Sequence, residues 1–112
     1  MSISLIVLEP KSKEYSLVNI PLATDEIFKR IWLPGAEQLS AVWLPLFQSG
    51  IDITAHDFKD VSQELIFLRE WVVQQTLVAD ERNLVLSRID SLLNELVRLD
   101  TETKGNITVF VG

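Results

Sequence analysis

The sequence predicts an α+β fold in which about four helices pack on a small sheet. Short runs rich in β-branched residues stand near both ends of the 112-residue chain, and the segment between them repeats apolar residues at helical spacing. A strand is not stable alone, so we expect the two terminal strands to pair and to offer the helices a face to cover. No linker or low-complexity tract interrupts the chain, which predicts one domain over residues 1–112.

Predicted strands frame the chain. The apolar run Ile3–Leu8 stops just before Pro10, which is typical of a buried strand. Residues 15–20 are expected to form a second strand that ends at Pro21, because proline cannot donate to a sheet. The last strand is predicted over Ile107–Val111, after a turn at residues 101–106.

Two helices are expected in the first half of the chain. The first begins at Thr24, a residue type favoured as an N-cap, and the two acids that follow suit the positive end of the helix dipole. Pro34 and Gly35 are expected to end this helix. A second helix is predicted over residues 36–47, with a kink or an early end at Pro45.

The two later helices are predicted more sharply. Residues 51–54 are expected to form an extended linker, after which Asp57 or Asp60 caps the third helix. The third helix has apolar residues at spacings of three and four, namely Phe58, Val61, Leu65, Leu68 and Val72. The fourth helix runs from Asp80 to about Asp100 and has an apolar seam at Val85, Ile89, Leu92, Leu96 and Leu99.

The composition excludes most classes of active site. The chain has no cysteine and one histidine, which excludes a disulfide framework, a thiolate zinc site, a multi-histidine metal site and a cysteine nucleophile. Its four glycines stand apart, so the glycine-rich motifs that cradle phosphates are missing. The net charge of −6 argues against nucleic-acid binding, which needs cations. We therefore expect a protein that is not an enzyme and that uses no cofactor and no metal.

The sequence also predicts a cytoplasmic protein without membrane association. The longest uncharged stretch, residues 38–51, is shorter than the about 20 apolar residues that a membrane-spanning helix needs. The N-terminal apolar run has no basic residue before it and no small-residue cleavage site after it, unlike a signal peptide.

All but one of the candidate functional residues lie in one acidic segment, residues 52–64, which carries a net charge of −3 and the only histidine. Acids at the start of a helix commonly cap it, and a column of His56, Asp60 and Glu64 could also hold a cation or act as a base. Another hypothesis is a docking surface for a basic protein, with an exposed tryptophan as its anchor. The partner-binding candidates are Asp52, His56, Asp57, Asp60, Glu64 and Trp43.

The chain as a whole resembles a class of protein inhibitors. It is short, acidic and free of cysteine, it opens with a strand, and it places Phe58, Glu64-Leu65 and Leu68 on a helix near the middle of the chain. This arrangement is similar to that of many small bacterial immunity proteins of polymorphic-toxin systems. The resemblance implies a cytoplasmic protein that inhibits a cognate toxin domain by stoichiometric binding, without a cofactor. It also implies that the toxin domain has a basic active site.

An alternative of a different class is a homo-oligomeric structural or adaptor protein. The seam over residues 85–99 steps by four and three residues for about two heptads, which is the pattern of a helix that pairs with another helix. The partner helix lies either in the same chain or in a second copy, so a homodimer is the competing expectation.

Overall fold

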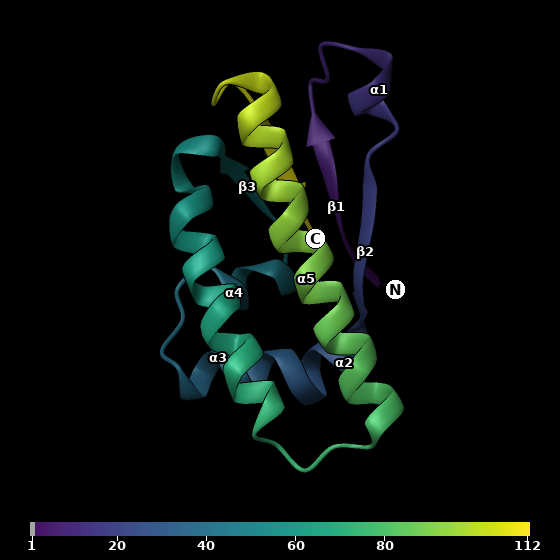
Figure 1. Cartoon of the computed structure of the whole chain (residues 1–112), viewed down its shortest axis with the longest axis vertical. Coiled ribbons are helices and arrows are strands. Elements are labelled where there is room, and N and C mark those ends of the chain that lie inside the picture. The colour runs from purple at the N-terminus through teal and green to yellow at the C-terminus, as the bar shows by residue number, and fades with distance from the viewer. Residues whose placement is uncertain (1) are drawn as a thin grey trace.

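The structure, a computed structural model, describes residues 2–112 and confirms the α+β class (Figure 1). The strands are β1 (Ser2–Leu8), β2 (Asn19–Thr24), β3 (Ile51–Thr54) and β4 (Thr108–Val111). They form an antiparallel sheet in the order β2–β1–β4–β3. The predicted pairing of the terminal strands is confirmed, because Leu5 opposes Val111 and Leu8 opposes Thr108.

Helices of very different lengths connect the strands. The long helices α4 (Phe58–Val73) and α5 (Ala79–Thr103) lie side by side over one face of the sheet (Figure 1). The shorter elements are α1 (Lys13–Ser16), α2 (Asp25–Ile27), the π-helical turn η1 (Phe28–Trp32), α3 (Leu33–Gln38), and the 3-10 turns η2 (Leu44–Gln48) and η3 (Ala55–Asp57).

The helices cover one face of the sheet and leave the other open. Alternate side chains of β1 point into the core, so Ile3, Leu5 and Val7 are buried, whereas Ile6 is 37% exposed on the opposite face. The same alternation leaves Asp52 exposed on β3. The open face is therefore available for contacts with other molecules, as is common for antiparallel sheets.

The seam predicted on the fourth helix lies in the core of the chain itself. Val85, Ile89, Leu92, Leu96 and Leu99 are each at most 1% exposed. The helical pattern over residues 85–99 is thus confirmed, but its partners are α4 and the sheet of the same chain. The seam is therefore occupied within one chain, and a homo-oligomer stays a prediction that would need another surface.

The second strand begins later than predicted. Tyr15 lies in α1, where Ser12 is the N-cap, and β2 starts only at Asn19. Pro21 does not end the strand but lies inside it opposite Ser4, next to a shift in the pairing register. Because β2 is an edge strand, the proline can be accommodated there without breaking the sheet.

The helix break predicted at Pro34 and Gly35 is wrong. Helical backbone continues over residues 25–38, because η1 inserts a wider turn in which the Leu33 N–H donates to the Phe28 carbonyl. Pro34 then falls in the first turn of α3, a position that tolerates its missing N–H. Gly35 lets α3 approach α4, since a Cβ at this position would lie 2.6 Å from Cδ1 of Leu68.

The second helix predicted over residues 36–47 is also wrong. The backbone leaves the helix at Leu39 and turns through Ser40, whose φ is +55°, before it enters η2 at Leu44. The expected linker at residues 51–54 is the strand β3, which pairs with the edge that β4 offers. The expected turn at residues 101–106 begins later, since α5 continues to Thr103.

Candidate functional site

Four of the six partner-binding candidates follow one another where β3 leads into α4. Asp52 lies on β3, His56 and Asp57 lie in η3, and Asp60 lies in the first turn of α4. Asp52, His56 and Asp60 are exposed, and Asp57 is half-buried. We call these four residues the acidic surface.

The carboxylates of the acidic surface are little used inside the chain. Asp57 stands at the N-cap position of α4, as one of the two predicted caps, but it makes no side-chain capping bond. Its Oδ2 instead accepts a hydrogen bond of 3.4 Å from the Thr54 hydroxyl. Asp52 and Asp60 have no hydrogen-bond or ion-pair partner within residues 2–112. Their charges therefore stay available to an external cation.

Glu64 does not belong to this surface. Its carboxylate accepts hydrogen bonds from the backbone N–H groups of Val42, Trp43 and Leu44, with N–O distances of 2.9, 2.9 and 3.1 Å. These donors lie at the start of η2, where no local side chain caps the turn. Glu64 thus has a structural role, and its carboxylate is already used within the chain, unlike those of Asp52 and Asp60.

The tryptophan predicted as an exposed anchor is half-buried. Trp43 packs against the core, and its backbone is tied to Glu64. Trp71 is also half-buried, and a Cβ at Gly35 would lie 2.7 Å from its ring. Trp32 is fully buried, and its indole Nε1 has no hydrogen-bond partner within the described chain. All three tryptophans therefore contribute to packing.

The column of His56, Asp60 and Glu64 is not formed. His56 precedes α4 in a 3-10 turn, and Glu64 is turned toward η2, so the three side chains do not share one site. Over residues 2–112, no group of three His, Cys, Asp or Glu residues is placed to hold a metal ion. The metal or base hypothesis for His56 has no geometric support.

Several acids elsewhere on the surface are matched with arginines. Arg30 donates to both carboxylate oxygens of Glu81 at 2.5 and 2.7 Å, and Arg69 donates to Asp90 at 2.8 Å. The hydrogen bonds from Arg30 hold the pKa of Glu81 below its ordinary value. No cation within residues 2–112 pairs with the carboxylates of the acidic surface, and the same is true of some isolated acids such as Glu37, Glu70 and Asp100. The acidic surface differs in that three such acids lie within nine residues of the sequence.

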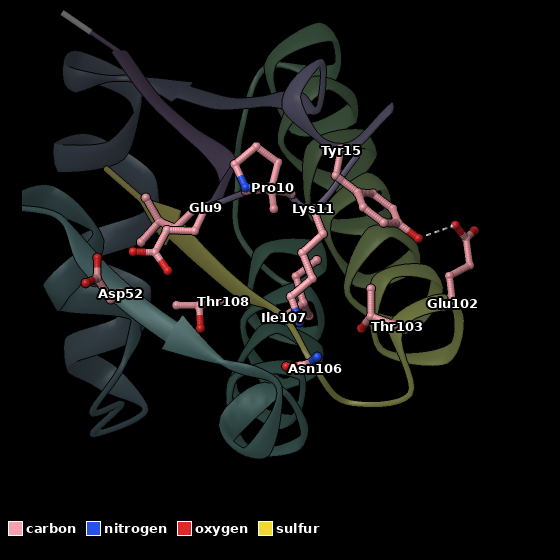
Figure 2. A pocket seen from close by; sticks show the side chains of 12 residues that line it. Glu9, Pro10, Lys11, Tyr15, Asp52, Glu102, Thr103, Asn106, Ile107 and Thr108 are labelled. Carbon is pink, nitrogen blue, oxygen red and sulfur yellow. Dashed lines mark hydrogen bonds between the residues drawn. The ribbon is translucent and has the colours of Figure 1, made fainter. Parts of the chain in front are cut away.

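A pocket of about 530 Å³ adjoins the acidic surface and shares Asp52 with it. It lies where the chain leaves β1, leaves α5 and enters β4. Figure 2 shows Lys11 reaching across the pocket, with Glu9 and Asp52 on one side and the pair Tyr15 and Glu102 on the other. Charged side chains from distant parts of the sequence thus meet in one concave site.

One wall of this pocket is held together by internal hydrogen bonds. The Tyr15 hydroxyl donates to Oε1 of Glu102 at 3.1 Å, and Arg98 donates to the same carboxylate at 3.1 Å. Desolvation, together with the hydrogen bond to Glu102, raises the pKa of Tyr15. This wall is already paired, so free charge in the pocket comes from the opposite side.

The pocket was missed because its charged side chains lie outside the predicted strands and helices, on residues expected to form turns or an extended linker. The pocket could have been predicted from the expected pairing of the terminal strands. In antiparallel strands, the residues after β1 lie beside those before β4, so residues 9–11 and 106–108 must meet at one end of the sheet. The acid that completes the site, Asp52, required β3 to be recognised as a strand.

Comparison of the chain with protein-family models, curated proteins and solved structures finds no match. Within the described residues, no helix has the length and apolar character needed to cross a membrane. The geometry of the acidic surface and its pocket is therefore the basis for assigning a function.

Proposed function

We propose that this chain is a small acidic protein-binding protein, of the immunity-protein type, that docks a basic partner on its acidic surface. The observation that carries the proposal is the run of three acids between residues 52 and 60, none of which pairs with a cation within residues 2–112. Asp52 and Asp60 are exposed without a cation in residues 2–112, whereas Glu81 and Asp90 of α5 are matched to arginines. Unmatched carboxylates favour a cationic partner, because their charge complements it and steers its approach.

The backbone under the acidic surface suits rapid and specific docking. Asp52 is on a strand paired with β4, and Asp60 is in the first turn of a helix of 16 residues. Groups that are held in place before binding lose little freedom when the complex forms. Against a toxin domain with a basic active site, these carboxylates take the place of substrate phosphates and block it stoichiometrically.

A capture experiment with a matched variant tests this proposal. Tagged wild-type protein and the triple variant Asp52→Lys, Asp57→Lys, Asp60→Lys are used to capture proteins from the source cells, with identification by mass spectrometry. We expect the wild type to retain one basic protein in a fixed ratio. The triple variant is expected to lose it, because like charges now face each other.

A second charge reversal on other exposed acids is the control for net charge. The variant Glu37→Lys, Glu70→Lys, Asp100→Lys changes the total charge equally but leaves the acidic surface intact. It is expected to retain the basic protein, and circular dichroism checks that both variants are folded. Equal capture by all three proteins, or no capture by the wild type, contradicts the proposal.

A further inference from the structure

We infer that the pocket beside the acidic surface receives an arginine side chain of the partner protein. This inference rests on the proposed function and names the group that the partner would insert. It is carried by the size of the pocket, by its aliphatic wall, and by three charged side chains in it that have no partner within residues 2–112.

The size and the walls of the pocket suit a long side chain. Its volume of about 530 Å³ falls in the range of about 300–1,000 Å³ typical of ligand sites, and it exceeds one side chain. Leu8, Pro10 and Ile107 supply aliphatic surface in the wall. The methylene stem of an arginine packs well on such a surface while its charged end reaches polar groups. The remaining volume holds backbone atoms of the same partner segment.

Two carboxylates in the pocket determine which charged group the end of the partner's side chain should carry. Glu9 and Asp52 lie on the same side of the pocket (Figure 2), and neither has a hydrogen-bond or ion-pair partner within residues 2–112. Glu9 follows β1 and Asp52 lies on β3, so β4 runs between the strands that position them. A guanidinium has five N–H donors in one plane and can serve two separate carboxylates, whereas a lysine ammonium is a more strongly hydrated point charge.

Lys11 adds a second requirement. Its side chain reaches across the pocket (Figure 2) and has no ion pair within the described chain. Glu102 is already bound by Tyr15 and Arg98, so it does not neutralise Lys11. Two free carboxylates and one free ammonium leave a net charge of −1. The pocket therefore favours a cation that brings an oxygen acceptor for Lys11, as an arginine does through its backbone carbonyl.

Other occupants match these groups less well. A phosphate or carboxylate ligand would face Glu9 and Asp52, which repel it. Over residues 2–112, no three acidic or histidine side chains are placed to ligate a metal ion. A second copy of the chain would bring another net charge of −6 to an acidic face. A basic partner protein can pair with Glu9 and Asp52 without this charge repulsion.

Amide-detected NMR of the full chain tests this inference. The probe is N-acetyl-arginine methylamide, and the matched control is the citrulline analogue, which has the same shape without the charge. We expect the arginine probe to shift the amide signals of Glu9, Asp52, Asn106 and Thr108. Its dissociation constant should be lower than that of the citrulline probe by a factor of about ten or more, since hydrogen bonds between charged groups are stronger than those between neutral groups. Glu9→Gln and Asp52→Asn are each expected to weaken binding by about tenfold.

Asp60→Asn is the control variant, because Asp60 is exposed but does not line the pocket, and it should leave probe binding unchanged. Equal binding of both probes, shifts elsewhere on the chain, or no effect of Glu9→Gln overturns the inference. Free arginine that binds more than tenfold tighter than the blocked probe also overturns it, in favour of a small-molecule ligand. Glu9 lies outside the acidic surface, so each of these results leaves the capture experiment free to support or contradict the proposed function.

Discussion

The carboxylate of Glu64 accepts a hydrogen bond from the backbone N–H of Trp43 at 2.9 Å. The contact ties the loop after α3 to α4, and the N–H groups on either side of Trp43 use the same carboxylate. One side chain thus satisfies the start of η2, whose donors have no local cap. The acids of residues 52–64 therefore have two different roles. Glu64 supports the fold, whereas the carboxylates of the acidic surface have no cation partner within residues 2–112.

Removal of the Glu64 carboxylate is expected to destabilise the chain. Glu64→Ala leaves three backbone donors without their acceptor, and we expect a loss of roughly 2 kcal/mol or more in the free energy of unfolding. Urea denaturation followed by circular dichroism measures this change. Gln63→Ala, at an exposed position of the same helix, is the control and should change stability little. A Glu64→Ala protein as stable as the control would show that the bonds contribute nothing.

The seam on α5 is expected to be essential to the monomer. Leu92→Ala should lower the free energy of unfolding by about 3 kcal/mol, because Leu92 is 0% exposed, and Leu92→Asp should prevent folding. Val97→Ala is the matched control, since Val97 is 65% exposed on the same helix. The measurement is urea denaturation combined with size-exclusion chromatography. A folded, monomeric Leu92→Asp protein would instead place this seam between two copies.

Glycine is expected to be required at position 50 for two reasons, the positive φ of its backbone and the closeness of the Phe110 ring. Gly50 has a φ of +96°, and a Cβ there would lie 2.6 Å from Cζ of Phe110. Gly50→Ala should cost about 2 kcal/mol, and part of this cost should disappear when Phe110 is replaced by Ala. Gly105→Ala is the control, because Gly105 also has a positive φ but its nearest atom is 3.6 Å away, so Phe110→Ala should not alter its cost. Denaturation of the six proteins gives both coupling energies. If Gly50→Ala lowers the free energy of unfolding equally with and without the Phe110 ring, the clash between the new Cβ and that ring is ruled out.

The pair between Arg30 and Glu81 predicts a dependence on pH. Hydrogen bonds from Arg30 to the charged carboxylate lower the pKa of Glu81 in the folded chain below the ordinary value of 4.5. A depressed folded pKa means that the pair stabilises the fold above the unfolded pKa and stops doing so as the pH falls through the folded pKa. NMR titration of the Glu81 carboxyl should give a midpoint below 4.5, and Arg30→Gln should raise it. A wild-type midpoint at or above 4.5 would contradict the pairing.

The elements governed by local chemistry could be predicted from the sequence. Thr24 caps its helix as expected, with Oγ1 accepting from the Ile27 N–H at 3.2 Å, and the apolar periodicity placed α4 and α5 correctly. The terminal strands pair as expected because each is an apolar run that needs a neighbour. The helix signals depend on residues close in the sequence, whereas the strand pairing follows from two apolar runs that each need a neighbour.

The errors arose where a distant contact decides the local backbone. Pro34 was expected to break a helix, but the π-helical turn before it accommodates the ring, and Gly35 packs α3 on α4. The loop from Leu39 to Trp43 is shaped by Glu64, which lies more than 20 residues further along the chain. In the candidate site, sequence reasoning found the exposed acids but could not see that Glu64 was already bonded. Nor could it see the pocket, whose groups come from segments far apart in the sequence.

The docking of a basic partner on the acidic surface is tested most directly by the association rate constant of the captured protein at rising salt concentration. For the wild type, we expect this rate constant to fall by about tenfold or more between about 0.05 M and about 0.5 M salt, because salt screens exposed charges. The variant Asp57→Asn, Asp60→Asn should associate more slowly at low salt and depend less on salt. A rate constant that is independent of salt and equal in both proteins would contradict docking through these carboxylates.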